Sequence, residues 1–594
     1  MSYRAPVADI AFALKHGAGM DEALSQGLYG DFGPDDVAVI LEEAGRFASE
    51  VIAPLNVGGD LHGTPLNDGH VTMPPGWKEA YAAWAAAGWN GLASPAAWGG
   101  QGLPRAVNAA CVEMWNAASM AFGIGPVLTM AGIDALALHG SEDLKKAYLP
   151  KLVSGEWMGT MQMTEPHAGS DVGALRTRAE RNADGSYRLF GQKIFITYGE
   201  HDLTDNIIHF VLARLPDAPP GTKGISLFLV PKFMLEEDGK LGQRNDVRAH
   251  SLEHKMGIHA SPTCTMVYGD NGGAVGYLVG KEHAGMACMF TMMNEARLMV
   301  GLQGVAIAER ATQQALQYAR ERKQGRGDTS KDAASMPIIE HVDVRRMLLT
   351  MRALTQGARA ICYATAIALD RSHLEKDADA RKDAADRAAL LTPVAKAFST
   401  DIGIEVASLG IQVHGGMGFI EETGAAQHYR DARIAAIYEG TNGIQAIDLV
   451  TRKLPLNGGE TIKTFIAELR DIVDDVSDNN DPDFGATANC LGEAIDNLEN
   501  ATGWLMAHLR SEIPSALAGA TPYLRMLANA AGGCLVAREA LAAIKHHDEV
   551  TRKDRIATAR FFAENIAVQN RGLEAIVVEA SASVTTAPLP GDVA

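Results

Sequence analysis

The feature that most constrains the fold of this chain is a single long interruption of helical periodicity. From about residue 35 to residue 158, and again from about residue 286, apolar residues recur at the spacing of amphipathic helices. Between about 159 and 280, alternating patterns bounded by turn residues replace that spacing and predict strands. The sequence therefore predicts a mainly α-helical protein with one small central β domain.

The best-defined strands are expected around the dipeptide Asp184-Gly185, a strong short hairpin signal. Residues 176–197 are interpreted as the two strands of this hairpin. Two more strands are expected at 207–215 and 224–231, separated by a Pro-Pro-Gly turn. In the helical part, Asp35-Asp36 begins an amphipathic helix, whose apolar face is expected to contain Val39, Ile40, Ala44, Phe47 and Val51.

A chain of 594 residues is too long for one hydrophobic core, so several domains are expected. The divisions follow the changes of pattern and a candidate linker at Asn457-Gly458-Gly459. They are an N-terminal cap segment (1–34), an N-terminal helical domain (35–158), a β domain (159–280), a helical bundle domain (281–455) and a C-terminal helical extension (456–594).

The net charge and the cysteines narrow the classes of function. A formal charge of −19 argues against a nucleic-acid or anionic-membrane partner, and the C-terminal extension is itself more acidic than basic. The six cysteines form no CxxC pair, so neither a metal site nor a disulfide framework is expected. The N-terminus lacks a signal-peptide pattern, and no stretch of eighteen uncharged apolar residues predicts a membrane span. We expect a cytoplasmic protein.

The strongest candidate for a catalytic group is Glu439, which lies between an apolar run and a predicted helix capped by Thr441 or Asn442. The positive end of that helix would help to keep the carboxylate ionised, whereas apolar neighbours such as Ile437 would raise its proton affinity. These opposed effects suit a general base. Taken alone, the stretch fits a solvated glutamate at a loop-to-helix junction better than a catalytic one.

The segment Tyr438-Glu439-Gly440-Thr441 resembles the active-site segment of the acyl-CoA dehydrogenases. The resemblance covers about residues 35–455 and implies the order α domain, β-barrel or sandwich domain, α bundle. It implies that Glu439 removes the α-proton of an acyl-CoA thioester while the β-hydrogen passes as hydride to FAD, giving a trans-2-enoyl-CoA. The residues implied to bind substrate are Ser170, Arg297, Tyr438 and Gly440.

Other motifs of that family carry the implied FAD site. Residues 161–171 resemble its Thr-Glu-Pro-x-Ala-Gly-Ser-Asp signature, and residues 191–197 resemble a strand whose aromatic residue contacts the flavin ring. Residues 318–326 and 412–418 resemble segments that reach the FAD pyrophosphate of a neighbouring subunit, so a homodimer or tetramer is implied. The implied FAD-binding residues are Met161, Met163, Thr164, Gly169, Ser170, Phe195, Thr197, Arg322, Gln324, Gln412, Gly415, Gly416 and Thr441.

Three features depart from the commoner family pattern. Phe195 stands where many relatives have Trp, Asn294 and Ala296 replace Asp and Thr beside Arg297, and Gln324-Gly325 replace Thr-Phe. Without the family context, Phe195 fits a core strand aromatic, the Arg322-Lys323 pair a solvated helix end, and Gly415-Gly416 a helix terminator. His414, His167 and His259 are interpreted as structural, and the many methionines as core packing.

The opening Tyr3-Arg4-Ala5-Pro6, His167 and the extension are similar to a longer subgroup that includes methylmercaptopropionyl-CoA dehydrogenases. The substrates implied are 3-methylmercaptopropionyl-CoA or a short to medium fatty acyl-CoA, in dimethylsulfoniopropionate degradation or fatty acid metabolism, with electron-transfer flavoprotein as the electron acceptor. Two alternatives remain: an acyl-CoA oxidase, which would return electrons to oxygen, and an alkylation-response flavoprotein acting on nucleic acid. The acidic extension and Glu439 argue against the second.

Overall fold

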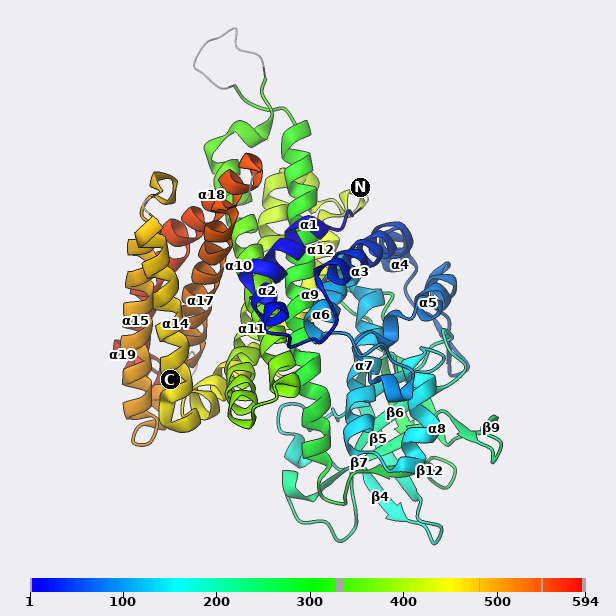
Figure 1. Ribbon diagram of the computed structural model, residues 1–594. Coiled ribbons are helices and arrows are strands. Elements are labelled where there is room, and N and C mark those ends of the chain that lie inside the picture. Colours follow the sequence, from blue (N-terminus) through cyan, green and yellow to red (C-terminus); the bar gives the residue numbers. More distant parts are fainter. Residues whose placement is uncertain (1–2, 327–334, 480, 546–547, 590–594) are drawn as a thin grey trace.

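The computed structural model describes all residues except 1–2, 327–334, 480, 546–547 and 590–594. Figure 1 shows three bodies side by side: a β region with N-terminal helices packed against it, a central bundle of long helices, and a separate group of C-terminal helices on the opposite side of the bundle. The predicted fold class, helical domains around one β domain with a C-terminal helical extension, is confirmed.

The N-terminal region is helical, and two of its helices, α6 and α7, are almost entirely buried. Its elements are α1 (Val7–Phe12), α2 (Met20–Ser25), α3 (Pro34–Phe47), α4 (Leu55–His62), the short strands β1 (Leu66–Asn67) and β2 (His70–Val71), α5 (Trp77–Ala86), α6 (Arg105–Ala118), α7 (Met120–His139) and α8 (Glu142–Val153). The apolar face expected for α3 is confirmed in part. Ala44 is buried, and Ile40 and Phe47 are partly buried against the core. Val39 is exposed, whereas Val37 and Leu41 are buried.

The β domain is an eight-stranded sheet in the order β10-β11-β5-β12-β7-β6-β3, with β4 pairing to β5 and β6. Its strands are β3 (Met158–Gln162), β4 (Arg178–Arg181), β5 (Tyr187–Thr197), β6 (Ile207–Arg214), β7 (Ile225–Pro231), β10 (Val247–Leu252), β11 (Thr263–Tyr268) and β12 (Ala274–Val279). A separate ribbon contains β8 (Phe233–Leu235) and β9 (Leu241–Arg244). The hairpin predicted around Asp184-Gly185 is confirmed as β4 and β5, with Arg181 opposite Tyr187. Strands β6 and β7 confirm the other two predictions.

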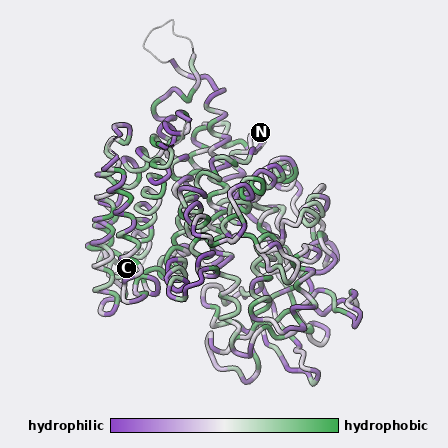
Figure 2. Tube along the Cα trace, viewed as in Figure 1, coloured by the Kyte–Doolittle hydropathy of each residue, from purple (hydrophilic) through white to green (hydrophobic). Residues whose placement is uncertain are grey.

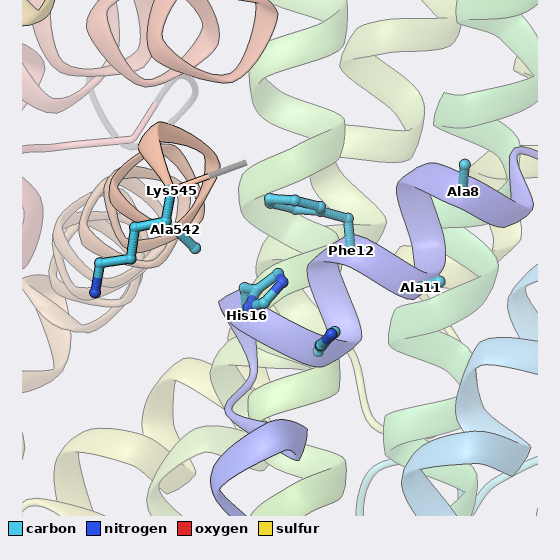
Figure 3. A pocket seen from close by; sticks show the side chains of 7 residues that line it. Ala8, Ala11, Phe12, His16, Ala542 and Lys545 are labelled. Atoms are coloured by element: carbon cyan, nitrogen blue, oxygen red, sulfur yellow. The ribbon is translucent and has the colours of Figure 1, made fainter. Parts of the chain in front are cut away.

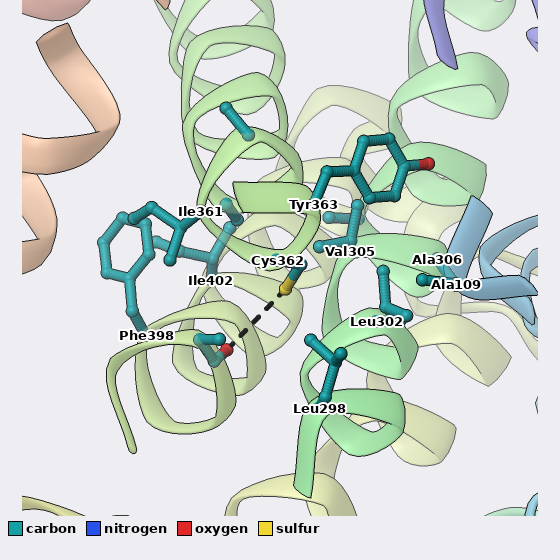
Figure 4. Packing of buried hydrophobic residues seen from close by; sticks show 14 of the residues in the cluster. Ala109, Leu298, Leu302, Val305, Ala306, Ile361, Cys362, Tyr363, Phe398 and Ile402 are labelled. Carbon is teal, nitrogen blue, oxygen red and sulfur yellow. Dashed lines mark hydrogen bonds between the residues drawn. The ribbon is translucent and has the colours of Figure 1, made fainter. Parts of the chain in front are cut away.

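The central bundle consists of three long helices, α9 (Gly285–Glu321), α10 (Val342–Leu374) and α11 (Ala378–His414). Leu298, Leu302 and Val305 of α9 meet Ile361 of α10 and Ile402 of α11 in its core (Figure 4). There the Cys362 thiol lies 3.3 Å from the Ser399 hydroxyl. The apolar residues coloured green in Figure 2 recur along these helices, as a buried three-helix core requires.

A buried ion network ties α10 to two other helices. The Arg359 guanidinium, which is fully buried, donates to the carboxylates of Glu113 on α6 and Glu309 on α9, at 2.6 and 2.8 Å. The Tyr363 hydroxyl donates to the same Glu113 carboxylate at 2.5 Å. Because a buried charge that loses its partner is strongly destabilising, this network fixes how the N-terminal helices sit on the bundle.

The C-terminal extension covers the outer side of the bundle. It contains α14 (Glu460–Asn479), α15 (Thr487–His508), α16 (Ile513–Ala518), α17 (Ala520–Ile544), α18 (Glu549–Asn565), α19 (Asn570–Glu579) and α20 (Ser581–Thr585). Helix α17 packs directly against α10, α11 and α13 (Asn442–Asp448), which begins just after Glu439. The extension therefore supports the helices that carry the candidate site.

The N-terminal segment is packed between the bundle and the extension. Ile10 and Ala13 are fully buried, and Asp9 accepts a hydrogen bond from Arg555 of α18 at 2.6 Å. Arg555 also pairs with the buried Glu539 of α17 at 2.8 Å. Beside this contact lies a pocket of about 460 Å³, to which both α1 and the C-terminal end of α17 contribute (Figure 3).

Two helices, α7 and α17, are long and apolar enough to cross a membrane by length and composition alone. Of their most apolar windows, 83% and 78% respectively are buried inside the protein. Burial of this extent is typical of core helices, so their composition is explained by packing.

Candidate active site

Glu439 lies in a left-handed turn between the one-turn helix Arg433–Ala436 and the start of α13. Its φ angle is 54°, and that of Gly440 is 80°. A residue with a side chain pays about 1–2 kcal/mol to adopt this conformation. Such strain persists where the surroundings hold it in place, and it concentrates at functional sites.

Three side chains hold this turn. The Gln445 amide donates to the carbonyl oxygens of Glu439 and Gly440, at 3.0 and 3.3 Å. The Lys396 ammonium of α11 donates to the Gly440 carbonyl and to the Asn442 side-chain oxygen, both at 2.9 Å. The Thr441 hydroxyl accepts from the Ile444 N–H at 3.3 Å, which confirms the predicted N-cap of α13.

The environment of the Glu439 carboxyl suits a base. Its Oε2 atom is buried and has no hydrogen-bond partner among the described residues. Burial raises the pKa of Glu439 to about 7, although the positive charges of Arg297 and Lys396 oppose that rise. A carboxyl group with a pKa near neutrality can both accept and release a proton at ordinary pH, as general-base chemistry requires.

Two residues expected to bind substrate flank this carboxyl. Arg297 of α9 has a buried Nε without a hydrogen-bond partner among the described residues, and burial lowers its pKa. The Tyr438 hydroxyl donates to the Gln303 side chain of α9. At the third such residue, Gly440, the positive φ favours glycine, and an added Cβ would lie 2.8 Å from the Gln445 amide nitrogen and displace that side chain from the turn.

The predicted flavin-binding residues of the β domain lie on neighbouring segments. Met161 is in β3, and the Thr164 carbonyl accepts from the Ile194 N–H of β5 at 2.9 Å. The Thr197 carbonyl accepts from the Thr160 hydroxyl at 2.7 Å. Phe195 has a φ of 60° and is 59% exposed, so its ring is available to stack against a planar ligand.

A buried ion pair fixes these segments to one another. The Lys193 ammonium of β5 contacts the Glu165 carboxylate at 2.8 Å and the Met163 carbonyl at 3.1 Å. The same carboxylate accepts from the N–H groups of Arg176 and Thr177, at 2.7 and 3.0 Å. Burial lowers the pKa of Lys193 to about 8, although Glu165 opposes this. Residues Gly169 and Ser170 follow on an exposed turn, with backbone open to a ligand.

The remaining predicted FAD-binding residues lie elsewhere in the chain. Arg322 and Gln324 follow the C-terminal end of α9, and the Arg322 guanidinium donates to the Gln324 side chain at 3.3 Å. Gln412 lies in the last turn of α11, and the exposed Gly415 and Gly416 follow the helix. With a helical rise of 1.5 Å per residue, Arg322 is about 37 Å along α9 from Arg297. One chain therefore does not bring both groups of residues to one point.

The histidines and methionines behave as structural residues. His414 stacks on Tyr318 and its Nδ1 contacts the Gly410 carbonyl, at 2.7 Å. His259 lies 2.9 Å from the Asp60 carboxylate. The methionines of the β-domain entrance and the start of α9 are buried in, or packed against, the apolar core: Met158, Met161, Met163, Met286, Met289, Met292 and Met293. Within the described ranges, no group of three His, Cys, Asp or Glu residues could hold a metal ion.

Several residues of the site were not found from the sequence, notably Lys396, Gln445, Gln303 and Lys193. Only Lys396 left a usable signal. It is a single cation in the apolar helical stretch 393–398, and a buried lysine requires partners. The sequence does not show that these partners lie in the turn beside Glu439, 44 residues away.

Comparison with known proteins finds four family models that match in order along the chain. They are the acyl-CoA dehydrogenase N-terminal domain (residues 34–156), middle domain (160–271) and C-terminal domain (283–454), and the acetyl-CoA dehydrogenase C-terminal-like domain (460–588).

Full-length relatives and solved structures agree with these matches. The chain is 46% identical to 3-methylmercaptopropionyl-CoA dehydrogenase from Ruegeria pomeroyi, over 99% of this chain and 100% of the relative. It is 36% identical to a butyryl-CoA dehydrogenase from Syntrophomonas wolfei, over 95% of each chain. An acyl-CoA dehydrogenase from Bacillus anthracis, crystallised with FAD, shares the fold with a TM-score of 0.74 at 23% identity, over 95% of this chain and 93% of that one.

Proposed function

Since this chain belongs to the acyl-CoA dehydrogenase family, we propose that Glu439 is the base that removes the α-proton of its acyl-CoA substrate. The reaction is the FAD-dependent α,β-dehydrogenation of an acyl-CoA thioester to a trans-2-enoyl-CoA. The observation that carries the proposal for Glu439 is its buried, unpartnered carboxylate oxygen at a pKa of about 7.

The roles of the chain's own residues follow from this assignment. FAD, when bound, supplies the acceptor for the hydride that leaves the β-carbon. The Glu439 carboxylate takes the α-proton, and we propose that the Glu439 backbone N–H holds the thioester carbonyl, where negative charge develops. The neighbouring Arg297 and Lys396 favour the ionised base. The strained turn sets the direction of the carboxylate.

The residues proposed to hold FAD fit a flavin. The exposed Phe195 ring offers a stacking surface, and the Lys193–Glu165 pair fixes the edge that contains Met161, Met163, Thr164 and Thr197. The turn at Gly169 and Ser170 offers open backbone. Thr441 beside the base completes the set within one chain. Arg322, Gln324, Gln412, Gly415 and Gly416 are proposed to act on the FAD of a second copy, because they lie at the far end of the bundle. A homodimer, or a larger assembly built from it, is therefore part of the proposal.

We further propose 3-methylmercaptopropionyl-CoA as the substrate, electron-transfer flavoprotein as the acceptor, and a cytoplasmic location. The support for the substrate is the 46% identity, end to end, to a dehydrogenase of that name. Relatives at 34–36% identity are named for butyryl-CoA and for linear acyl-CoAs, so a short fatty acyl-CoA is the alternative. We also propose that the chain divides into the five segments expected from its sequence: 1–34, 35–158, 159–280, 281–455 and 456–594.

The test of the base is Glu439→Gln, which keeps the backbone N–H and nearly the same shape. We expect a folded, FAD-loaded protein whose flavin spectrum is perturbed by acyl-CoA but bleaches at least about 10²–10⁴-fold more slowly under anaerobic conditions. Glu422→Gln, an exposed carboxyl on the preceding loop, is the matched control and should bleach like the parent. Bleaching of Glu439→Gln at the parental rate would remove Glu439 from this role.

The test of substrate and acceptor uses the parent protein. A panel of 3-methylmercaptopropionyl-, butyryl- and octanoyl-CoA should give the highest kcat/KM for the sulfur-containing substrate. Reduced enzyme should reoxidise slowly in air and rapidly with electron-transfer flavoprotein. Fast reoxidation in air would identify an acyl-CoA oxidase.

A further inference from the structure

Lys396 is buried in the bundle, and its ammonium group points at the turn that carries Glu439. It comes from α11, whereas the turn precedes α13. The Lys396 Nζ contacts two acceptors at 2.9 Å, the Gly440 carbonyl and the Asn442 side-chain oxygen. These contacts bracket Thr441 and follow Glu439 directly.

The partner Asn442 is itself fully engaged, so the lysine meets a fixed acceptor. Its amide nitrogen donates to the Ala397 carbonyl, the Thr400 hydroxyl and the Asp401 carboxylate, at 3.1, 3.0 and 2.7 Å. All three lie on α11, within about one turn of Lys396. One end of α13 is thereby fixed to one stretch of α11.

We propose that Lys396 is a positioning residue for the base: it holds the left-handed Glu439–Gly440 turn in place through the Gly440 carbonyl and Asn442, and its positive charge favours the ionised form of Glu439. The proposal rests on the function assigned above. Glu439 has a positive φ, and in a residue with a side chain such a conformation persists only where the surroundings impose it. Gln445 donates to the same Gly440 carbonyl and also to the Glu439 carbonyl.

The electrostatics are consistent with this geometry. Burial lowers the pKa of Lys396 to about 7, while Glu439 and Asp401 raise it and Arg297 lowers it. Around this group, Asp448 and Arg452 act on Arg297, and Arg525 and Glu405 act on Asp401. Among these charges, Arg297 and Lys396 are the two that lower the pKa of Glu439. Without Lys396, Arg297 is the only one of these two groups that still lowers the pKa of Glu439.

The test compares Lys396→Met, which loses both charge and hydrogen bonds, with Lys396→Gln, which keeps an N–H donor without the charge. Lys463→Met, at an exposed lysine on α14, is the matched control. One readout is hydrogen–deuterium exchange of the amides of residues 438–445. The other is the pH dependence of kcat/KM with a substrate that reduces the parent flavin.

In Lys396→Met, we expect the backbone amides of residues 438–445 to exchange faster than in the parent. We expect the loss of activity to appear mainly as a lower kcat. In both Lys396 variants the acid limb of kcat/KM should move up by about one pH unit, because an opposite charge lowers a carboxyl pKa by about that much or more. At pH 7 this shift alone lowers kcat/KM about five-fold. Lys396→Gln should retain most of the parental exchange protection.

The proposal is wrong if Lys396→Met has the same amide exchange in residues 438–445 and the same acid limb of kcat/KM as the parent. If that variant does not fold, an unmoved acid limb in Lys396→Gln overturns it equally. If none of the acyl-CoAs reduces the flavin of the parent protein, the proposed function is refuted instead. The exchange measurement would still test the positioning role.

Discussion

The pKa of Glu439 predicts a strong dependence of catalysis on pH. A base works in its deprotonated form, and burial places the pKa of Glu439 at about 7. Lowering the pH from 8 to 6 should therefore reduce the deprotonated fraction from about 91% to about 9%, a roughly tenfold loss of kcat/KM. A solvated glutamate, with a pKa of about 4.3, would lose only about 2% over the same range. The two cases are easily distinguished.

The assay is anaerobic stopped-flow bleaching of the flavin at low acyl-CoA concentration, which reports the free enzyme. Because Lys396 also has a pKa of about 7 and interacts with Glu439, the acid limb belongs to the pair and is expected to be broader than a single titration. Flavin occupancy must be constant over the range. A rate constant that is flat between pH 6 and pH 8 would refute the assignment of a raised pKa to the base.

Two further predictions concern the proposed FAD site. Arg322→Ala should lower FAD retention in dialysis much more than it lowers thermal stability, because an exposed arginine adds little to folding whereas a phosphate contact is charge-assisted; equal flavin occupancy in variant and parent would contradict this role. Lys193→Met should destabilise the β domain by about 3–5 kcal/mol in urea unfolding, since it leaves the buried Glu165 without its cation. The double variant Lys193→Met, Glu165→Gln should recover part of that loss, and no recovery would mean that the pair itself is not responsible.

Local signals in the sequence predicted local structure well. The Asp184-Gly185 hairpin and the Thr441 N-cap depend on residues a few positions apart, and both are confirmed. The face of α3 was predicted only in part, because apolar residues occur on more than one side of the helix and packing decides which of them are buried. Val39 is consequently exposed while Val37 is buried.

The sequence groups site residues only where they occur together in one motif. Glu439 and its neighbours occur together in the sequence, so their grouping needed no knowledge of the fold. The contacts of Lys396 with Gly440, and of Tyr438 with Gln303, join different helices. Their formation depends on the register of α9, α11 and the turn, which the periodicity of each helix alone does not determine. The same holds for the parallel pairing of β3 with β6.

The contact between Asp9 and Arg555 has a consequence for how the protein is made. These residues are 546 positions apart, so the N-terminal helix leaves the ribosome long before its partner exists. Helix α10 likewise precedes α17, which covers it, by about 150 residues, or on the order of ten seconds at about 5–20 residues per second. The nascent chain must therefore carry an undocked first helix through most of its synthesis, and an uncovered bundle face while α17 is being made. The last helices to be translated complete the packing of the first.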